Sequence, residues 1–171
     1  MPVRAATYDD LPAILDIYNE VIQNTTAVYS YQPHTLEMRQ QWFNERIEKA
    51  FPVFVFDVDG TVAGFGSYGP FRIWPAYKYT VENSVYVHPD FRGKGIAKQI
   101  LHVLIDEAVR KEYHAMIAGI DSTNAISIRL HEQLGFTEVA HFKQVGYKFG
   151  RWLDLKFFER LLPTPKHPTE D

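Results

Sequence analysis

The chain has 171 residues, of which 46% are hydrophobic and 23% charged, and it contains no cysteine. This length and composition are typical of one globular domain with a substantial core. Its 18 basic and 21 acidic side chains give a formal charge of −3, so no nucleic-acid partner is expected. The lack of cysteine excludes disulfides, iron–sulfur clusters and thiolate zinc sites. Residues 1–7 lack the apolar core of a signal peptide, and no apolar run is long enough to span a bilayer, so we expect a cytoplasmic protein with no membrane partner.

Strand and helix patterns alternate along the chain. Strand patterns occupy residues 3–6, 52–58, 61–67, 79–87 and 114–120, and two segments between residues 136 and 158 on either side of a turn at residues 149–150. Helical periodicity of apolar residues marks residues 11–22, about 35–49, 96–110 and 124–134. This mixed order predicts a single α/β or α+β domain.

Several local features refine these elements. Thr7 and Asp10 have the spacing of a helix capping box, and Gly64 and Gly66 inside a strand indicate close backbone packing or a bulge. Three residues of the second helix are expected to face inward: Trp42, Phe43 and Ile47. Residues 163–171 contain three prolines, which predicts a flexible C-terminal tail after a domain of residues 1–162.

A glycine-containing loop joins the strand that ends near Val87 to the helix that starts near Ile96. Its residues 92–97 read Arg-Gly-Lys-Gly-Ile-Ala. A helix start carries about four backbone N–H groups without internal partners, and glycine lets a ligand approach them closely. The loop therefore favours a pyrophosphate ligand.

Three glycine-loop patterns compete for this segment. The P-loop requires Ser or Thr where Ile96 stands, and the dinucleotide fingerprint requires a third glycine where Lys98 stands, so both fail. The third pattern, Arg/Gln-x-x-Gly-x-Gly/Ala, fits residues 92–97 and resembles the acetyl-CoA loop of the GNAT superfamily of N-acetyltransferases. Residues 124–136, Asn-Ala-x-Ser-x-x-Leu-x-x-x-Leu-Gly-Phe, resemble the second CoA-side motif of that superfamily.

The resemblance extends to a subfamily over nearly the whole chain. Residues 24–27, 77–87 and 146–154 are similar to the phosphinothricin and methionine sulfoximine acetyltransferases. This implies a single-domain GNAT fold, with a mixed central sheet of about six or seven strands and about four helices, and a homodimer. It also implies that acetyl-CoA is the co-substrate and is bound by Val85, Tyr86, Val87, Arg92, Gly93, Lys94, Gly95, Ile96, Ala97, Lys98, Asn124 and Ser127.

Glu82 is the leading candidate for the general base. An amine must lose a proton before it attacks a thioester, and strand alternation puts Glu82 on the same face as Ser84 and Tyr86. The subfamily carries a base at this position. The alternative is a solvated strand residue or an ion-pair partner.

His131 directly follows Leu130, and many members of the superfamily carry a tyrosine at the position that His131 occupies. We assign His131 as a general acid or substrate-side base. The alternative is a histidine on the helix surface. Asn124 fits a contact with CoA, and its alternative is a helix N-cap.

The segment from Phe71 to Tyr77 is the expected substrate-selecting loop. Arg72 can pair with a carboxylate or phosphinate, and the aromatic residues can wall a methylene chain. The alternative is an exposed loop whose aromatic side chains pack on the first helices. Tyr29, Tyr31 or Trp42 could complete the substrate pocket. For Trp42, packing in the helix core is the better interpretation. The expected substrate contacts are Arg72, Trp74, Pro75, Ala76, Tyr77, Glu82, Asn83 and Val85.

The subfamily resemblance implies direct acetyl transfer to the α-amino group of a small amino-acid analogue. No His-Glu-x-x-His motif is present, so no metal is expected. Two other functions stay open. One is acetylation of another amine, such as a peptide N-terminus, a lysine or a polyamine. The other is acyl-CoA sensing without catalysis.

Overall fold

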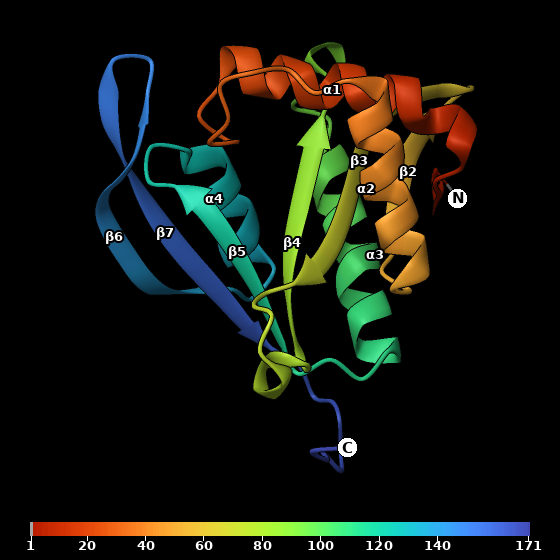
Figure 1. Cartoon of the computed structure of the whole chain (residues 1–171), viewed down its shortest axis with the longest axis vertical. Coiled ribbons are helices and arrows are strands. Elements are labelled where there is room, and N and C mark those ends of the chain that lie inside the picture. Colours follow the sequence, from red (N-terminus) through yellow and green to blue (C-terminus); the bar gives the residue numbers. More distant parts are fainter. Residues whose placement is uncertain (1) are drawn as a thin grey trace. The chain divides into compact units, whose positions relative to one another are not determined.

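The computed structural model describes residues 2–171, which form seven strands and four α-helices. Their bounds are β1 Val3–Ala5, α1 Leu11–Asn24, α2 Leu36–Glu48, β2 Val53–Val58, β3 Thr61–Pro70, β4 Thr80–Val87, α3 Ile96–Arg110, β5 Ala115–Asp121, α4 Ala125–Gln133, β6 Thr137–Lys148 and β7 Arg151–Leu161. The strands form one mixed sheet in the order β1-β2-β3-β4-β5-β7-β6 (Figure 1). The predicted fold class and the predicted numbers of strands and helices are confirmed.

Two compact units share this chain. The first contains the residues up to Tyr68 together with Ser84–Leu104, and the second contains Gly69–Asn83 and Ile105–Asp171. The chain passes from one unit to the other within β3, within β4 and within α3. No helix among residues 2–171 is long and apolar enough to cross a membrane.

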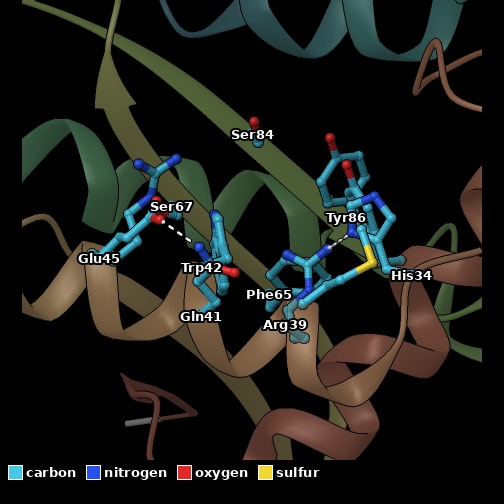
Figure 2. A pocket seen from close by; sticks show the side chains of 12 residues that line it. His34, Arg39, Gln41, Trp42, Glu45, Phe65, Ser67, Ser84 and Tyr86 are labelled. Carbon is cyan, nitrogen blue, oxygen red and sulfur yellow. Dashed lines mark hydrogen bonds between the residues drawn. The ribbon is translucent and has the colours of Figure 1, made fainter.

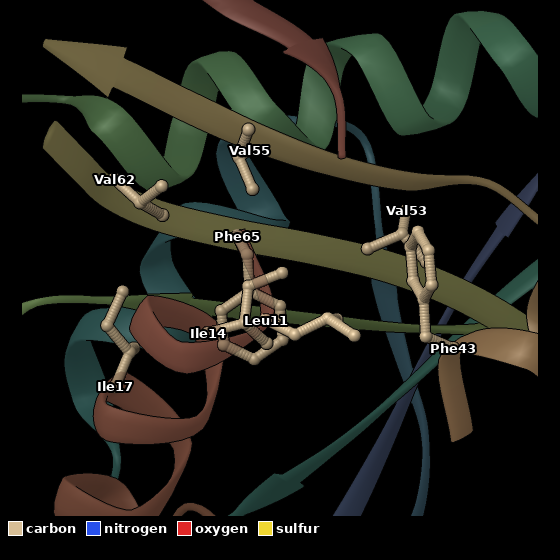
Figure 3. Packing of buried hydrophobic residues seen from close by; sticks show 8 residues of the cluster. All are labelled: Leu11, Ile14, Ile17, Phe43, Val53, Val55, Val62 and Phe65. Carbon is tan, nitrogen blue, oxygen red and sulfur yellow. The ribbon is translucent and has the colours of Figure 1, made fainter. Parts of the chain in front are cut away.

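The first unit is built around a hydrophobic cluster between two helices and the β2–β3 hairpin (Figure 3). The cluster consists of Leu11, Ile14, Ile17, Phe43, Val53, Val55, Val62 and Phe65. Helical periodicity explains the residues from α1, and strand alternation explains those from β2 and β3. Ile47 was expected to join this core, but that prediction is wrong, because 56% of its surface is exposed.

Glycines on β3 allow other elements of the first unit to come very close. A Cβ atom at Gly64 would lie 2.9 Å from the carbonyl oxygen of Tyr86, and one at Gly66 would lie 2.5 Å from Cγ2 of Ile100. Phe65 between them points to the opposite face, toward α1 and α2. The predicted close packing at Gly64 and Gly66 is therefore confirmed.

The start of the chain is fixed by an ionic network. The Asp10 carboxylate accepts hydrogen bonds from the backbone and hydroxyl of Thr7, which confirms the predicted capping box. Arg4 pairs with Asp10 and Asp57, at 2.8 Å in each case. Hydrogen bonds from Arg4 hold the pKa of the Asp10 carboxyl below its usual value.

In the second unit, β5 pairs along its whole length with β7, in antiparallel register from Ala115↔Leu161 to Asp121↔Leu155. Strand β4 pairs with β5 in parallel through Thr80–Glu82. The C-terminal residues are hydrogen bonded to the body of this unit: Thr164 donates to the Tyr113 carbonyl, and the Thr169 backbone donates to the Tyr79 hydroxyl. The domain boundary after residue 162 and the flexibility of the tail stay predictions.

Candidate active site

The predicted phosphate loop lies in the first unit, between β4 and α3. A short 3₁₀ turn, Pro89–Phe91, leads into it, and the first α-helical bond runs from the Gln99 amide to the Gly95 carbonyl. The amides that precede Gln99 in the helix therefore have no intrahelical partner. Gly93 and Gly95 have φ values of +77° and +76°, which favour glycine, and no atom lies within 4 Å of a Cβ built at either one. The loop can accept a ligand close to its backbone.

The two cations of this loop are held differently. Arg92 donates from Nε to the Val87 carbonyl and pairs with Glu20 of α1. Lys94 is exposed, and its Nζ donates to the carbonyl of Asp90 at 3.1 Å. Glu20 thus balances much of the charge of Arg92, and the main role of Arg92 is to hold the loop in shape. The positive charge that can attract an anion belongs to Lys94 and to the exposed Lys98.

Glu82 lies in the second unit at the last paired position of β4, opposite Ile117 of β5. Its side chain is half-buried and forms no hydrogen bond or ion pair within residues 2–171. Burial raises the pKa of this carboxyl above its usual value. A Cβ at Gly119 would lie 3.3 Å from Oε1, so this glycine keeps space open beside the carboxylate. The ion-pair alternative for Glu82 is not observed.

His131 is buried, with 4% of its surface exposed, so the alternative of a surface histidine is wrong. Its Nδ1 lies 2.8 Å from the carbonyl oxygen of Ser127, and its Nε2 lies 3.2 Å from Oδ1 of Asn83. Since a carbonyl only accepts, Nδ1 carries the proton that is donated to Ser127. Burial lowers the pKa of the His131 imidazole.

Asn83 connects His131 to the point where β4 and β5 part. Its amide Nδ2 donates to the Ile117 carbonyl at 3.4 Å, immediately after the last paired position of β4. Asn83 is buried, with 7% of its surface exposed. Both ring nitrogens of His131 are therefore engaged by the protein, and its contact with the rest of the site passes through Asn83.

The second motif begins with a capped helix. Oδ1 of Asn124 accepts from the Ser127 amide at 3.1 Å, so the N-cap alternative for Asn124 is observed. The turn before it is fixed by Asp121, which was not among the predicted site residues. Asp121 is buried at the end of β5 and accepts from the backbone and hydroxyl of Thr123. An acidic residue at the end of an apolar strand, followed by Ser-Thr-Asn, was the available signal.

The expected substrate loop is exposed and partly held by aromatic contacts. The Phe71 ring packs edge-on against Tyr77 at 5.8 Å and against Phe157 of β7 at 5.9 Å. The Arg72 guanidinium lies 5.8 Å from the centre of the Tyr77 ring and forms no ion pair within residues 2–171. Trp74 is 63% exposed. The loop thus presents one unpaired cation beside aromatic rings.

Comparison with known proteins agrees with the family that the sequence motifs resemble. Residues 13–136 match the sequence profile of the Acetyltransferase (GNAT) family. The chain belongs to the GNAT family. The L-methionine sulfoximine/L-methionine sulfone acetyltransferase of Salmonella typhimurium is 44% identical to it over 171 residues, which cover 100% of this chain and 99% of the relative. The phosphinothricin N-acetyltransferase of Streptomyces viridochromogenes is 34% identical and covers 97% and 91% of the two chains.

Solved GNAT structures agree in fold and in cofactor. A putative acetyltransferase of Salmonella typhimurium, solved with acetyl-CoA, has a TM-score of 0.95 at 44% identity and covers 98% of this chain and 96% of its own. A phosphinothricin acetyltransferase of Sinorhizobium meliloti in complex with acetyl-CoA has a TM-score of 0.91 at 36% identity and covers 95% and 89% of the two chains. The chain is therefore an acetyl-CoA-dependent N-acetyltransferase. No group of three or more potential metal ligands gathers anywhere in residues 2–171.

The glycine loop provides the first test of the predicted acetyl-CoA contacts. We expect Gly95→Ala to raise the KM for acetyl-CoA by about tenfold, because its methyl group and its strain at φ +76° disturb the amides of the helix start. Gly60→Ala is the matched control, since Gly60 has φ +84° and equally open surroundings but lies in the β2–β3 turn. Both variants are expected to lose about 1 kcal/mol of stability, as measured by urea unfolding. An equal KM in the two variants would contradict the assignment of the loop.

Proposed function

We propose that this GNAT enzyme transfers the acetyl group of acetyl-CoA to the α-amino group of a small amino-acid analogue of the methionine sulfoximine or phosphinothricin type. We further propose Glu82 as its general base. The observation that carries this proposal is the state of the Glu82 carboxylate, which is half-buried, unpaired and raised in pKa. The names of the relatives support the substrate class.

The reaction assigns a simple task to this carboxylate. The amine of an amino acid is mostly protonated at neutral pH and cannot attack a carbonyl in that form. Glu82 accepts the proton, directly or through a water molecule in the space beside Gly119. The free amine then attacks the thioester carbon, a C–N bond forms, and the C–S bond breaks. The nitrogen loses its second proton to give the amide, and this proton neutralises the departing thiolate, so that CoA leaves as the free thiol. A carboxylate with a raised pKa is a better match for this transfer than an ordinary surface glutamate.

His131 supports the site through Asn83. A hydrogen bond between Nε2 and the Asn83 side chain forms either with the imidazolium, which donates to Oδ1, or with the neutral ring once the Asn83 amide is turned so that Nδ2 donates to Nε2. Burial favours the neutral ring. We propose that this pair orients the backbone of β4 next to Glu82. Direct proton donation to the departing thiolate by His131 stays a prediction from the sequence, as do the contacts of Asn124 with CoA and of Trp74 with substrate.

A substrate panel tests the proposed acceptor. Incubation with acetyl-CoA and L-methionine sulfoximine or phosphinothricin is expected to release free thiol with a kcat/KM well above that for a peptide N-terminus, a lysine peptide or spermidine. The comparison of kcat/KM values measures this preference. Preference for the peptide or the polyamine would overturn the acceptor class, and CoA binding without turnover of any amine would favour a sensor.

The role of Arg72 is tested within the same assay. Arg72→Gln is expected to raise the KM for methionine sulfoximine by about tenfold while the KM for acetyl-CoA stays unchanged. Lys78→Gln, which removes another exposed cation at the end of this loop, serves as the control. An unchanged KM for both substrates in Arg72→Gln would remove Arg72 from the substrate site.

We also propose that the enzyme is a homodimer that contacts its copy through the β6–β7 hairpin. Support comes from exposed apolar side chains on this hairpin: Val139, Phe142, Val145, Tyr147, Phe149 and Trp152. A cluster of this kind is typical of protein interfaces. Sedimentation velocity at micromolar concentration measures the mass directly, and a monomer would overturn the proposal. The cytoplasmic location stays a prediction from the sequence.

A further inference from the structure

A cavity lies in the first unit, lined by residues of α1, α2, β3 and β4 (Figure 2). Its volume is about 360 Å³, at the lower end of the range for small-molecule sites. Four aromatic rings line it, those of Tyr18, Trp42, Phe65 and Tyr86. Of the predicted acetyl-CoA contacts, Tyr86 lines this cavity, and neither Glu82 nor the glycine loop does.

Arg39 of α2 is a buried cation in the wall of the cavity, with only 3% of its surface exposed. Its guanidinium carbon lies 4.0 Å from the centre of the Tyr18 ring and 4.6 Å from that of the Trp42 ring. Its Nη2 lies 3.3 Å from Nδ1 of His34, which must accept this bond because a guanidinium only donates (Figure 2). The Nε–H of Arg39 is buried and has no hydrogen-bond partner.

Arg46 lies two turns after Arg39 on the same face of α2 and resembles it in its surroundings. Its Nε is also buried without a hydrogen-bond partner, and its guanidinium lies 5.6 Å from the Trp42 ring. Neither arginine forms an ion pair within the described residues 2–171. The carboxylate in the lining is that of Glu45, which is exposed and accepts from Gln41 at 3.4 Å.

Positive charge in this cavity is therefore left without a buried counter-ion. A buried charge and a buried unpaired N–H group both cost free energy unless a partner compensates them. Stacking on aromatic rings offsets part of this cost for the guanidinium plane, but it leaves the two Nε–H groups without a partner. A carboxylate complements a guanidinium in charge and geometry, because its oxygens accept in the guanidinium plane. The aromatic rings in turn suit a flat apolar body.

We propose that this cavity binds a small organic carboxylate with a flat apolar body, held by the guanidinium groups of Arg39 and Arg46 and by the surrounding aromatic rings. The residues that carry the site are the two arginines, with Trp42 between them in sequence. This binding differs from the proposed acetyl transfer, because it uses neither Glu82 nor the glycine loop.

Benzoate is a direct probe for this site. We expect the full-length protein without acetyl-CoA to bind benzoate saturably and to bind benzamide, which has the same shape without the charge, at least about tenfold more weakly. The readout is the indole N–H signal of Trp42 in a heteronuclear NMR titration, assigned with a Trp42→Phe variant. Equal affinity for the two probes, or no saturable shift with either, would overturn the proposal.

Variants of the two arginines locate the binding. Arg46→Gln is expected to weaken benzoate binding by about tenfold, whereas Arg110→Gln, at an exposed arginine on α3, leaves it unchanged. If Arg46→Gln does not fold, Arg46→Lys keeps the charge but loses the Nε–H group, and it is expected to weaken binding as well. Full benzoate affinity in the folded Arg46 variant contradicts the site. Thiol release with methionine sulfoximine is measured separately. It tests the proposed acetyl transfer, whereas the benzoate titration tests the cavity, so the failure of one proposal can be told from the failure of the other.

Discussion

Replacing Glu82 with glutamine is expected to lower kcat/KM at neutral pH by about a hundredfold or more. The amide keeps the size of the side chain but cannot accept the proton of the ammonium group. The residual rate of the variant is expected to rise as the pH is raised, because the fraction of free amine in solution then increases. Thiol release at saturating acetyl-CoA measures both quantities.

The pH dependence of the natural enzyme follows from the raised pKa of Glu82. The base works only when ionised, so kcat/KM is expected to fall as the pH drops through this raised pKa, which lies above the usual value for a glutamate. In Glu82→Gln the inflection at this pKa is expected to disappear, and the low residual rate should instead rise steadily with pH as the free amine becomes more abundant. Glu48→Gln, at an exposed glutamate of α2, is the matched control and should keep both the rate and the inflection. Near-full activity of Glu82→Gln at neutral pH would exclude Glu82 as the base.

Stability separates this loss of activity from misfolding. Because the folded state raises the pKa of Glu82, it binds more protons than the unfolded state between the two pKa values. The contribution of Glu82 to stability therefore falls as the pH rises through this window and is unfavourable above it. Glu82→Gln removes this contribution, so its melting temperature at pH 7 is expected to be no lower than that of the natural chain.

The order of the elements and the glycine loop could be predicted because both depend on local patterns. Apolar residues with helical spacing defined α3 at residues 96–110, as observed, and the strand patterns at residues 52–58 and 61–67 marked the two strands of the β2–β3 hairpin. The loop between Val87 and Ile96 depends on Gly93 and Gly95, whose positive φ angles few other residue types adopt. Such patterns are local in sequence, so they can be recognised without knowledge of the tertiary contacts.

Burial was the property that the sequence could not provide. His131 is a polar residue on α4 for which a surface position stayed open, yet it is buried, and its Nε2 lies 3.2 Å from Oδ1 of Asn83 on β4, 48 residues away. Ile47 is apolar but exposed, whereas the charged Arg39 on the same helix is buried. Which face of α2 is covered depends on α1 and the sheet, so periodicity alone could not select it. The cavity with its two arginines was missed for this reason.

Gly66→Ala is expected to cause the largest loss of stability, about 3 kcal/mol, which for a chain of this size lowers the melting temperature by about 10 °C. The new methyl group would lie 2.5 Å from Cγ2 of Ile100 and 3.2 Å from the carbonyl oxygen of Ser84. Ile100 cannot yield easily, because it is fully buried. Thermal unfolding followed by circular dichroism measures the change.

The cause of this loss can be isolated with a double-mutant cycle. Ile100→Ala removes the clashing methyl group and leaves a cavity, so the double variant is expected to be more stable than the sum of the two single losses predicts. Gly60→Ala controls for glycine replacement itself, since no atom lies within 4 Å of its added carbon. If the losses of unfolding free energy at Gly66 and Ile100 are additive, the added methyl group does not collide with Ile100, and β3 and α3 move apart to accommodate it. A coupling of about 1 kcal/mol or more would instead identify the contact between Gly66 and Ile100 as the one that fixes α3 on the sheet. The helix start predicted to bind acetyl-CoA would then be held in position by the core beneath it.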